Sequence, residues 1–149
     1  MFRLTLLAAL ALTALVAFTQ PQQPEPTSTD LKAVLDPLLL DEWHAEALYA
    51  QVITDLGEVR PFVNIIEAER RHADFLLQLY STYNLAVPAR TSATQPTFAT
   101  LIDACTASKQ AEIDNAGLYD VALAETLPDD VRAVITRNRD ASLDRHLPA

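Results

Sequence analysis

Hydrophobic residues recur every three or four positions over most of the chain beyond the first thirty residues, which is the period of an amphipathic helix. The pattern is helical over 31–56 and predicts a first helix from about Pro37, because proline is tolerated only near a helix start. Gly57 is placed to end that helix. A second helix is predicted over 61–83.

The second half of the chain shows the same period after a break. Residues 84–96 are rich in Pro, Thr and Ala and predict a loop. A short helix over 98–107 and a third main helix over 108–127, capped by Ser108, follow unless the two are continuous. A fourth helix is predicted over 128–147. No segment shows the sustained alternation of a half-buried strand, so the fold class predicted is all-α, a four-helix bundle.

The first thirty residues concern location rather than fold. Within residues 1–18, Arg3 supplies a positive charge, and the run over 4–18 is apolar except for Thr5 and Thr13. This pattern is typical of an export signal, because about 15 residues are short for a membrane span. An uncleaved membrane anchor is the alternative. Residues 19–30 form a polar, proline-rich linker. We therefore expect an exported protein, periplasmic or extracellular or attached to the membrane through 4–18, with its folded domain over 31–149.

Composition limits the classes of function. Half of the 149 residues are hydrophobic, enough for one core, and only 2 glycines accompany 9 prolines, which favours helices over hairpins. The formal charge of -9 argues against nucleic-acid binding, which needs a basic surface. Cys105 is the only cysteine, so neither an internal disulfide nor a multi-cysteine metal site can form within one chain. No serine is framed by glycines as in nucleophilic hydrolases.

Carboxylates and imidazoles stand at helical spacing within the predicted helices. Glu69 and His72 form a Glu-x-x-His unit, whose two side chains share one helix face and can reach one metal ion. Glu42 on the first helix, Glu112 on the third and His146 on the fourth could face the same interior. Carboxylates neutralise hard cations, and a neutral imidazole suits iron or zinc. The pattern therefore predicts a metal site between the helices.

Two tyrosines follow the isolated glutamates at equal distance. Tyr49 lies seven residues after Glu42, and Tyr119 lies seven after Glu112. Seven residues are almost two turns, so each pair shares a helix face. Each phenol is either a core aromatic with a polar partner or a hydrogen-bond donor into the site. The repeated spacing suggests a two-fold relation between the first and third helices.

Several of these residues also have plainer interpretations. Glu69 and His72 could form a surface pair, and His146 could be exposed near a fraying chain end. Glu46, one turn after Glu42, is an alternative candidate for the ligand on the first helix. His44 points away from the predicted site.

The spacings resemble motifs of bacterioferritins and rubrerythrins, members of the ferritin-like superfamily: Glu42 to Tyr49, Glu69 to His72, and Glu112 to Tyr119. The segments 61–65 and 141–147 are more similar to the bacterial ferritin-like domain of unknown function 2202 family. The resemblance spans about 36–147. It implies a ferritin-like four-helix bundle that binds iron or another divalent metal, with redox activity of a ferroxidase or peroxide-reducing type.

One ligand of the di-metal pattern is missing. The pattern calls for a second Glu-x-x-His unit on the fourth helix, but Leu143 stands three residues before His146, and Asp144 lies about 100° further round the helix. Three carboxylates and two imidazoles can hold one metal or an asymmetric pair. The first hypothesis is therefore an exported metal-binding protein with an incomplete di-metal site. The alternative is a metal-free structural or interaction module on the same scaffold. Either could form a homo-oligomer.

Overall fold

The computed structural model describes residues 27–91 and 94–149, and within them the chain forms four α-helices and no strand. The helices are α1 (Ser28–Leu56), α2 (Phe62–Thr82), α3 (Leu101–Leu123) and α4 (Asp129–Ala141), and α4 runs on into a π-helical turn, η1 (Ser142–His146). The all-α, four-helix prediction is confirmed. None of these helices is long and apolar enough to cross a membrane. The export signal or anchor predicted at 1–18 lies outside the described residues, as does most of the predicted linker.

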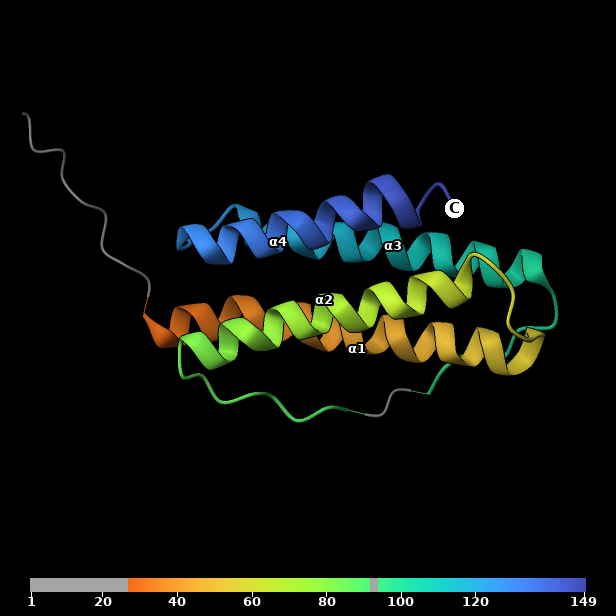
Figure 1. The fold of residues 1–149 in the computed structure, drawn as a ribbon, viewed down its shortest axis with the longest axis horizontal. Coiled ribbons are helices and arrows are strands. Elements are labelled where there is room, and N and C mark those ends of the chain that lie inside the picture. The colour runs from red at the N-terminus through yellow and green to blue at the C-terminus, as the bar shows by residue number, and fades with distance from the viewer. Residues whose placement is uncertain (1–26, 92–93) are drawn as a thin grey trace, which may run out of the picture.

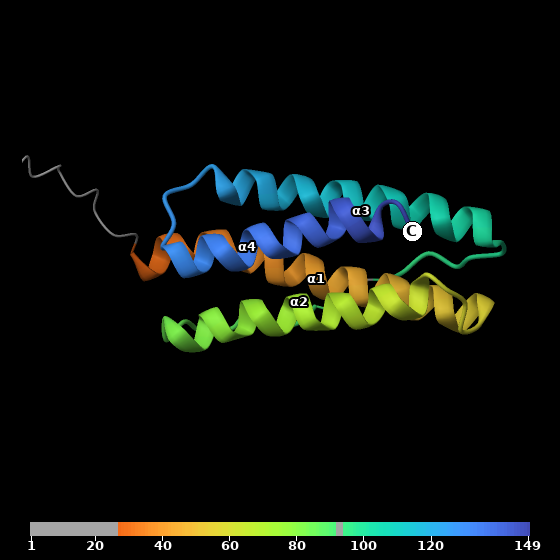
Figure 2. The same ribbon diagram turned by 45° about the horizontal axis from the view of Figure 1, so that its top comes forward.

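The helices form two antiparallel pairs, α1 with α2 and α3 with α4, which pack side by side (Figure 1, Figure 2). The connection between α2 and α3 runs back along the whole bundle. It lies against α1, where Arg90 donates a hydrogen bond to Glu46 (2.5 Å) and the backbone N–H of Phe98 donates to Asp55 (2.8 Å). Because of this long crossover, α2 and α3 run in the same direction.

Helix α1 begins at Ser28, nine residues before the predicted start at Pro37. Thr27 and Asp30 form a capping box, in which each side chain accepts a hydrogen bond from the other's backbone N–H. Pro37 lies inside the helix on its exposed side. Ala33, whose carbonyl loses its usual amide partner, is exposed as well, so water can take the place of that amide. A capped start and a hydrated proline position make the longer helix tolerable.

Helix α3 is one continuous helix. Thr100 caps it by accepting a hydrogen bond from the backbone N–H of Asp103. Ser108 was predicted to be the cap, but it lies inside the helix and is buried. Of the two alternatives left open by the sequence, the continuous one is correct.

The fourth helix does not stay α-helical to its end. Its last turn, η1, closes with a hydrogen bond from the backbone N–H of Leu147 to the carbonyl of Ser142 (2.9 Å), five residues back. This turn is wider than an α-helical turn, so it changes which side chains face the bundle.

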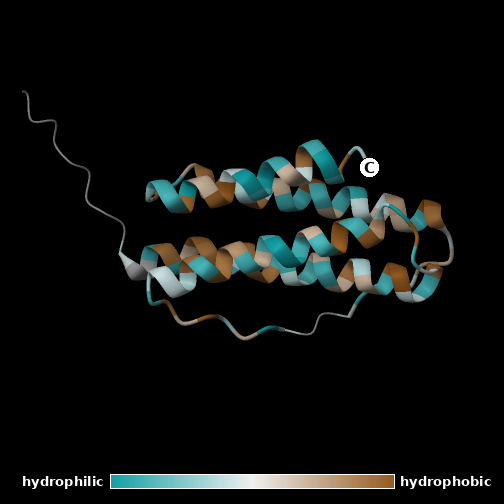
Figure 3. Cartoon of the chain, viewed as in Figure 1, coloured by the Kyte–Doolittle hydropathy of each residue, from teal (hydrophilic) through white to brown (hydrophobic). Residues whose placement is uncertain are grey.

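The interior of the bundle contains two apolar clusters. One, the Leu35 cluster, includes Leu35, Leu76 and Ile135 and occupies the end where α1 begins. The other, the Phe62 cluster, includes Phe62 and Ile65 and occupies the end where α2 begins. Along each helix, hydrophobic positions are interrupted by hydrophilic ones (Figure 3). Several of these hydrophilic residues lie between the two clusters and are buried.

Candidate metal centre

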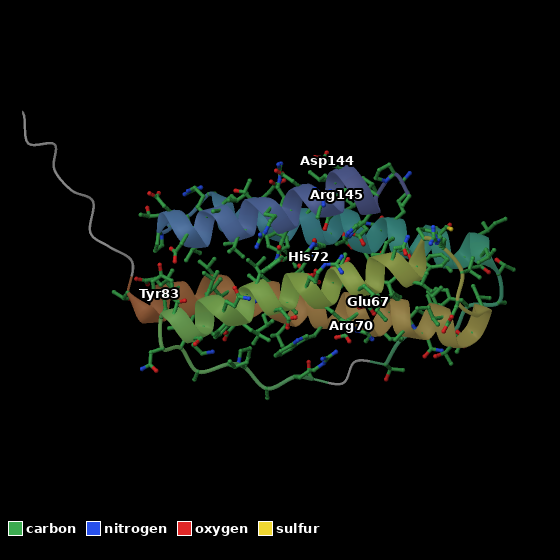
Figure 4. The ribbon with its side chains drawn as sticks, viewed as in Figure 1. Glu67, Arg70, His72, Tyr83, Asp144 and Arg145 are labelled. Atoms are coloured by element: carbon green, nitrogen blue, oxygen red, sulfur yellow. The ribbon has the colours of Figure 1, made fainter. Side chains whose placement is uncertain are left out.

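Five carboxylate and imidazole side chains are buried halfway along the bundle, between the Leu35 and Phe62 clusters. Their exposed fractions range from 0% to 8%, and they are Glu42, Glu69, His72, Glu112 and His146. His72 points from α2 toward the α3–α4 pair (Figure 4). The structure therefore brings together all five residues that the sequence singled out as ligands. The interpretation of Glu69 and His72 as a surface pair, and of His146 as an exposed terminal residue, is wrong.

The ligand atoms form two triads that share Glu69. In the first triad, Nδ1 of His72 lies 3.2 Å from Oε2 of Glu69 and 3.4 Å from Oε2 of Glu42. In the second, Nδ1 of His146 lies 2.9 Å from Oε1 of Glu69 and 3.3 Å from Oε2 of Glu112. Each triad could hold one cation, with the two oxygens of Glu69 divided between them.

The spacing of these atoms fits metal coordination. Two donor atoms about 2.1 Å from a shared cation lie about 3.0 Å apart in octahedral and about 3.4 Å apart in tetrahedral coordination. The four distances from Nδ1 to carboxylate oxygen, 2.9 to 3.4 Å, fall near these values. Moreover, Oε2 of Glu42 and Oε1 of Glu69 are buried, and the nearest side-chain donor to each is an imidazole Nδ1, at 3.4 Å and 2.9 Å. Buried carboxylate oxygens are costly unless a donor or a cation satisfies them.

The two tyrosines bind the glutamates in a crossed arrangement. Tyr49 on α1 donates a hydrogen bond to Oε1 of Glu112 on α3 (2.5 Å), and Tyr119 on α3 donates to Oε1 of Glu42 on α1. Each phenol thus holds one oxygen of the opposite helix's glutamate and leaves the other oxygen facing an imidazole. Both tyrosines are fully buried, so the core role and the site contact left open by the sequence are both correct.

Burial and mutual contact shift the protonation of the centre. Burial raises the pKa of Glu42 to about 8, although His72 opposes the rise. Burial alone would lower the pKa of His72, but the carboxylates of Glu42 and Glu69 outweigh it and raise the pKa to about 9. The pKa of His146 is raised to about 9 in the same way, by Glu112 and Glu69. Burial opposes ionisation of Glu69, yet the two imidazoles hold its pKa well below the usual range.

Three further polar residues surround the centre, and the sequence pattern did not single them out. Asn115 donates hydrogen bonds from Nδ2 to Asp41 (2.8 Å) and to Oε1 of Glu42 (3.4 Å). Asn138 donates to the phenol oxygen of Tyr119 (3.0 Å), and Ser142 donates to Oδ1 of Asn115 (2.7 Å). Asparagines at these positions carry no repeated spacing, so the sequence pattern did not mark them.

The wide turn η1 changes the residue that faces the centre on the fourth helix. Counting back three residues from His146 placed Leu143 where a second carboxylate would lie. In the structure Ser142, four residues back, is completely buried, whereas Leu143 is only half-buried. Because a π-helical turn holds more residues than an α-helical one, Ser142 and not Leu143 lines up with His146.

The remaining polar candidates lie away from the centre. Glu46 pairs with Arg70 and Arg90 and is therefore no substitute ligand. Arg70 lies on the side of α2 away from His72, and Asp144 on the outer side of the last turn (Figure 4). His44 is exposed, as expected.

One cavity in the described part of the chain lies away from this centre. It measures about 780 Å³ and lies between the start of α1 and the end of α3, lined by residues such as Val34, Leu118 and Val121. None of the five candidate ligands lines it. The ligand cluster is thus embedded in the packed interior of the bundle rather than at the floor of an open pocket.

Comparisons with known proteins gave no match. No protein-family model matches the chain, and neither a curated protein nor a solved structure matches it significantly. What is established is therefore an all-α, four-helix fold with buried Glu and His clusters that could bind a metal ion.

Proposed function

We propose that this chain is a ferritin-like protein that binds divalent metal at the centre of its bundle, with iron as the first candidate. The observation that carries the proposal is the convergence of buried carboxylate oxygens from Glu42, Glu69 and Glu112 with two imidazole nitrogens in two triads. The single long crossover supports the ferritin-like assignment, since that is the connectivity of ferritin-like bundles.

The donor set favours a borderline cation. It contains carboxylate oxygen and imidazole nitrogen and no thiolate, which suits iron, zinc or manganese better than a soft metal such as Cu(I). Three carboxylates offset most of the charge of two divalent ions. An iron pair, when bound, would supply one-electron redox chemistry with oxygen or peroxide, and an oxidoreductase activity of this kind is an extension of the proposal.

The chain's own residues divide the work of holding the cations. Glu42 with His72 would hold one ion, and Glu112 with His146 the other, while Glu69 would serve both. The phenols of Tyr49 and Tyr119 orient the two outer carboxylates. The apolar clusters on either side exclude water, which strengthens the electrostatic attraction between ligand and ion.

The test is the metal content and thermal stability of the purified chain after expression with iron. Wild type should retain metal, and added metal at about a thousand times its Kd should stabilise it by about 4 kcal/mol. Glu69→Gln should lose both metal and stabilisation, because both triads share Glu69. Glu67→Gln is the matched control, since Glu67 lies on the same helix, exposed and paired with Arg70. Equal metal in wild type and Glu69→Gln would refute the proposal.

A metal-free module on the same scaffold is the second candidate, and one observation favours it. Nδ1 of His72 lies 3.2 Å from Glu69, and Nδ1 of His146 lies 3.3 Å from Glu112, so protonated imidazoles could neutralise the carboxylates without a cation. This candidate predicts no change in melting temperature when metal is added to chelator-treated protein.

Export is the proposal for location. It rests on residues 1–18, and the test is fractionation of cells that express the full chain. Recovery in the periplasm or medium with 1–18 removed supports export, and recovery with membranes supports the anchor.

A further inference from the structure

The fourth helix presents a small neutral side chain where the di-metal pattern has its second bridging carboxylate. Ser142 is completely buried and lines up with His146 through the wide turn η1. Its hydroxyl donates to Asn115, whose amide in turn reaches Glu42. The interior beside Ser142 is therefore polar and receives no carboxylate from the fourth helix, whereas the α2 side carries Glu69. The half-buried Asp41 of α1 also accepts a hydrogen bond from Asn115.

The protein ligands alone leave two cations short of donors and short of negative charge. Each triad offers three donor atoms: one imidazole nitrogen, one oxygen of an outer glutamate and one oxygen of Glu69. Cations of this class take about four to six ligands. The three ligand carboxylates also carry one negative charge fewer than two divalent cations require, and Asp41 belongs to neither triad. An uncompensated charge is expensive in an interior where the ligands are at most 8% exposed.

Building on the proposed function, we propose that a small carboxylate anion from solution completes the centre, bound to both cations on the η1 side, opposite Glu69. A glutamate differs from a serine at this position by a methylene and a carboxylate, which together correspond to acetate. A monoanion of this size would supply the missing charge and two oxygen donors. Because Ser142 stands in place of a glutamate, the anion that completes the site should be a short-chain carboxylate.

The experiment is a titration of the chelator-treated, full-length protein with Co²⁺ in sodium chloride and in sodium acetate of equal ionic strength. Cation number and affinity are read from equilibrium dialysis and from the visible absorption of bound Co²⁺. We expect two cations per chain, with the second bound about tenfold more tightly when acetate is at about ten times its own Kd, because an anion that binds only the loaded form stabilises it. Identical titrations in chloride and acetate with two cations bound would overturn the inference and leave the proposed function standing. No binding in either salt would overturn both.

Two substitutions locate the anion. Ser142→Glu supplies a carboxylate from the buried side, so it should bind two cations in chloride and lose the acetate effect. Leu143→Glu is the matched control, because Leu143 is only half-buried, and it should keep the acetate effect. Acetate dependence lost in Leu143→Glu and kept in Ser142→Glu would contradict the placement. If Ser142→Glu fails to fold, as judged by circular dichroism, the wild-type comparison of acetate and chloride decides.

Discussion

The ends of the bundle interior and its middle are built on opposite principles. At the ends, the Leu35 and Phe62 clusters bury apolar side chains, each contributing about 25 cal/mol of stability per Å² removed from water. In the middle, the same four helices bury carboxylates and imidazoles, whose desolvation works against folding. Stability and binding are thus carried by separate layers of one interior. Substitutions should be able to change one layer without the other.

The largest effect on stability is expected from the apolar layer. Leu76 is completely buried in the Leu35 cluster, so Leu76→Ala should lower the free energy of unfolding by about 2–5 kcal/mol. The cation number of the folded variant should stay that of wild type. Denaturant unfolding in chelator and equilibrium dialysis with Co²⁺ measure the two quantities. Loss of cation binding at a temperature where the variant is folded would show that the layers are not separate.

A smaller effect on stability, accompanied by weaker cation binding, is expected at the crossed tyrosines. Tyr119→Phe removes the hydrogen bond that orients Glu42 and should weaken cation affinity by about 10–100-fold. Tyr80→Phe is the matched control, because Tyr80 donates to Asp36 from within the Leu35 cluster (2.6 Å). That control should lose about 1 kcal/mol of stability and keep its cation affinity. Equal affinity losses in the two variants would contradict a specific role for Tyr119.

The two forms of the protein should respond to pH in opposite directions. In the metal-free form, the pKa values of His72 and His146 are raised from 6.5 to about 9. The two protonated imidazoles therefore contribute fully to folding stability below about pH 6.5, and this contribution is lost as pH rises through about 9. The pKa of Glu42 is raised from 4.5 to about 8, so ionisation of this carboxyl also lowers folding stability as pH rises. The melting temperature in chelator should therefore fall between pH 6.5 and 9.

In the metal-loaded form the trend should reverse, because a cation binds the deprotonated ligands. Stabilisation by added metal should grow over the same pH range, and binding at pH 7 should release protons from both histidines and from Glu42. Calorimetry in two buffers of different ionisation enthalpy counts those protons. Cation binding without proton release would contradict the protonation state assigned to the metal-free centre.

The smallest effect on stability is expected at Glu42. Because its pKa is raised to about 8, the metal-free carboxyl is mainly protonated at pH 7, and Glu42→Gln replaces it with a neutral group of the same shape. The metal-free stability should fall by no more than about 1 kcal/mol, whereas one of the two cations should be lost. A large loss of metal-free stability would show that the ionised form of Glu42 supports the fold.

Periodicity accounts for most of the fold, and fails where two local effects compete. The second helix and the all-α class follow from the apolar spacing. The start of the first helix does not follow from the spacing. A proline such as Pro37 predicts a helix start only where nothing offsets the loss of the backbone hydrogen bond that it removes from a helix interior. Here the capping box at Thr27 and solvent on the Pro37 face offset it. The wide turn at the end of the fourth helix leaves no trace in the spacing, and it turns Leu143 further from the face of His146 while Ser142 stays on that face.

The sequence by itself determined the helical class and the identity of the five acidic and imidazole residues, since a three- or seven-residue spacing puts side chains on one face of a helix whatever surrounds it. The tertiary structure alone decided that Glu69 is shared, that each tyrosine serves the opposite glutamate, and that Ser142 faces the centre. These relations join residues on different helices or depend on a local change of helical pitch. They are therefore set by how the helices pack, which one-dimensional spacing does not encode.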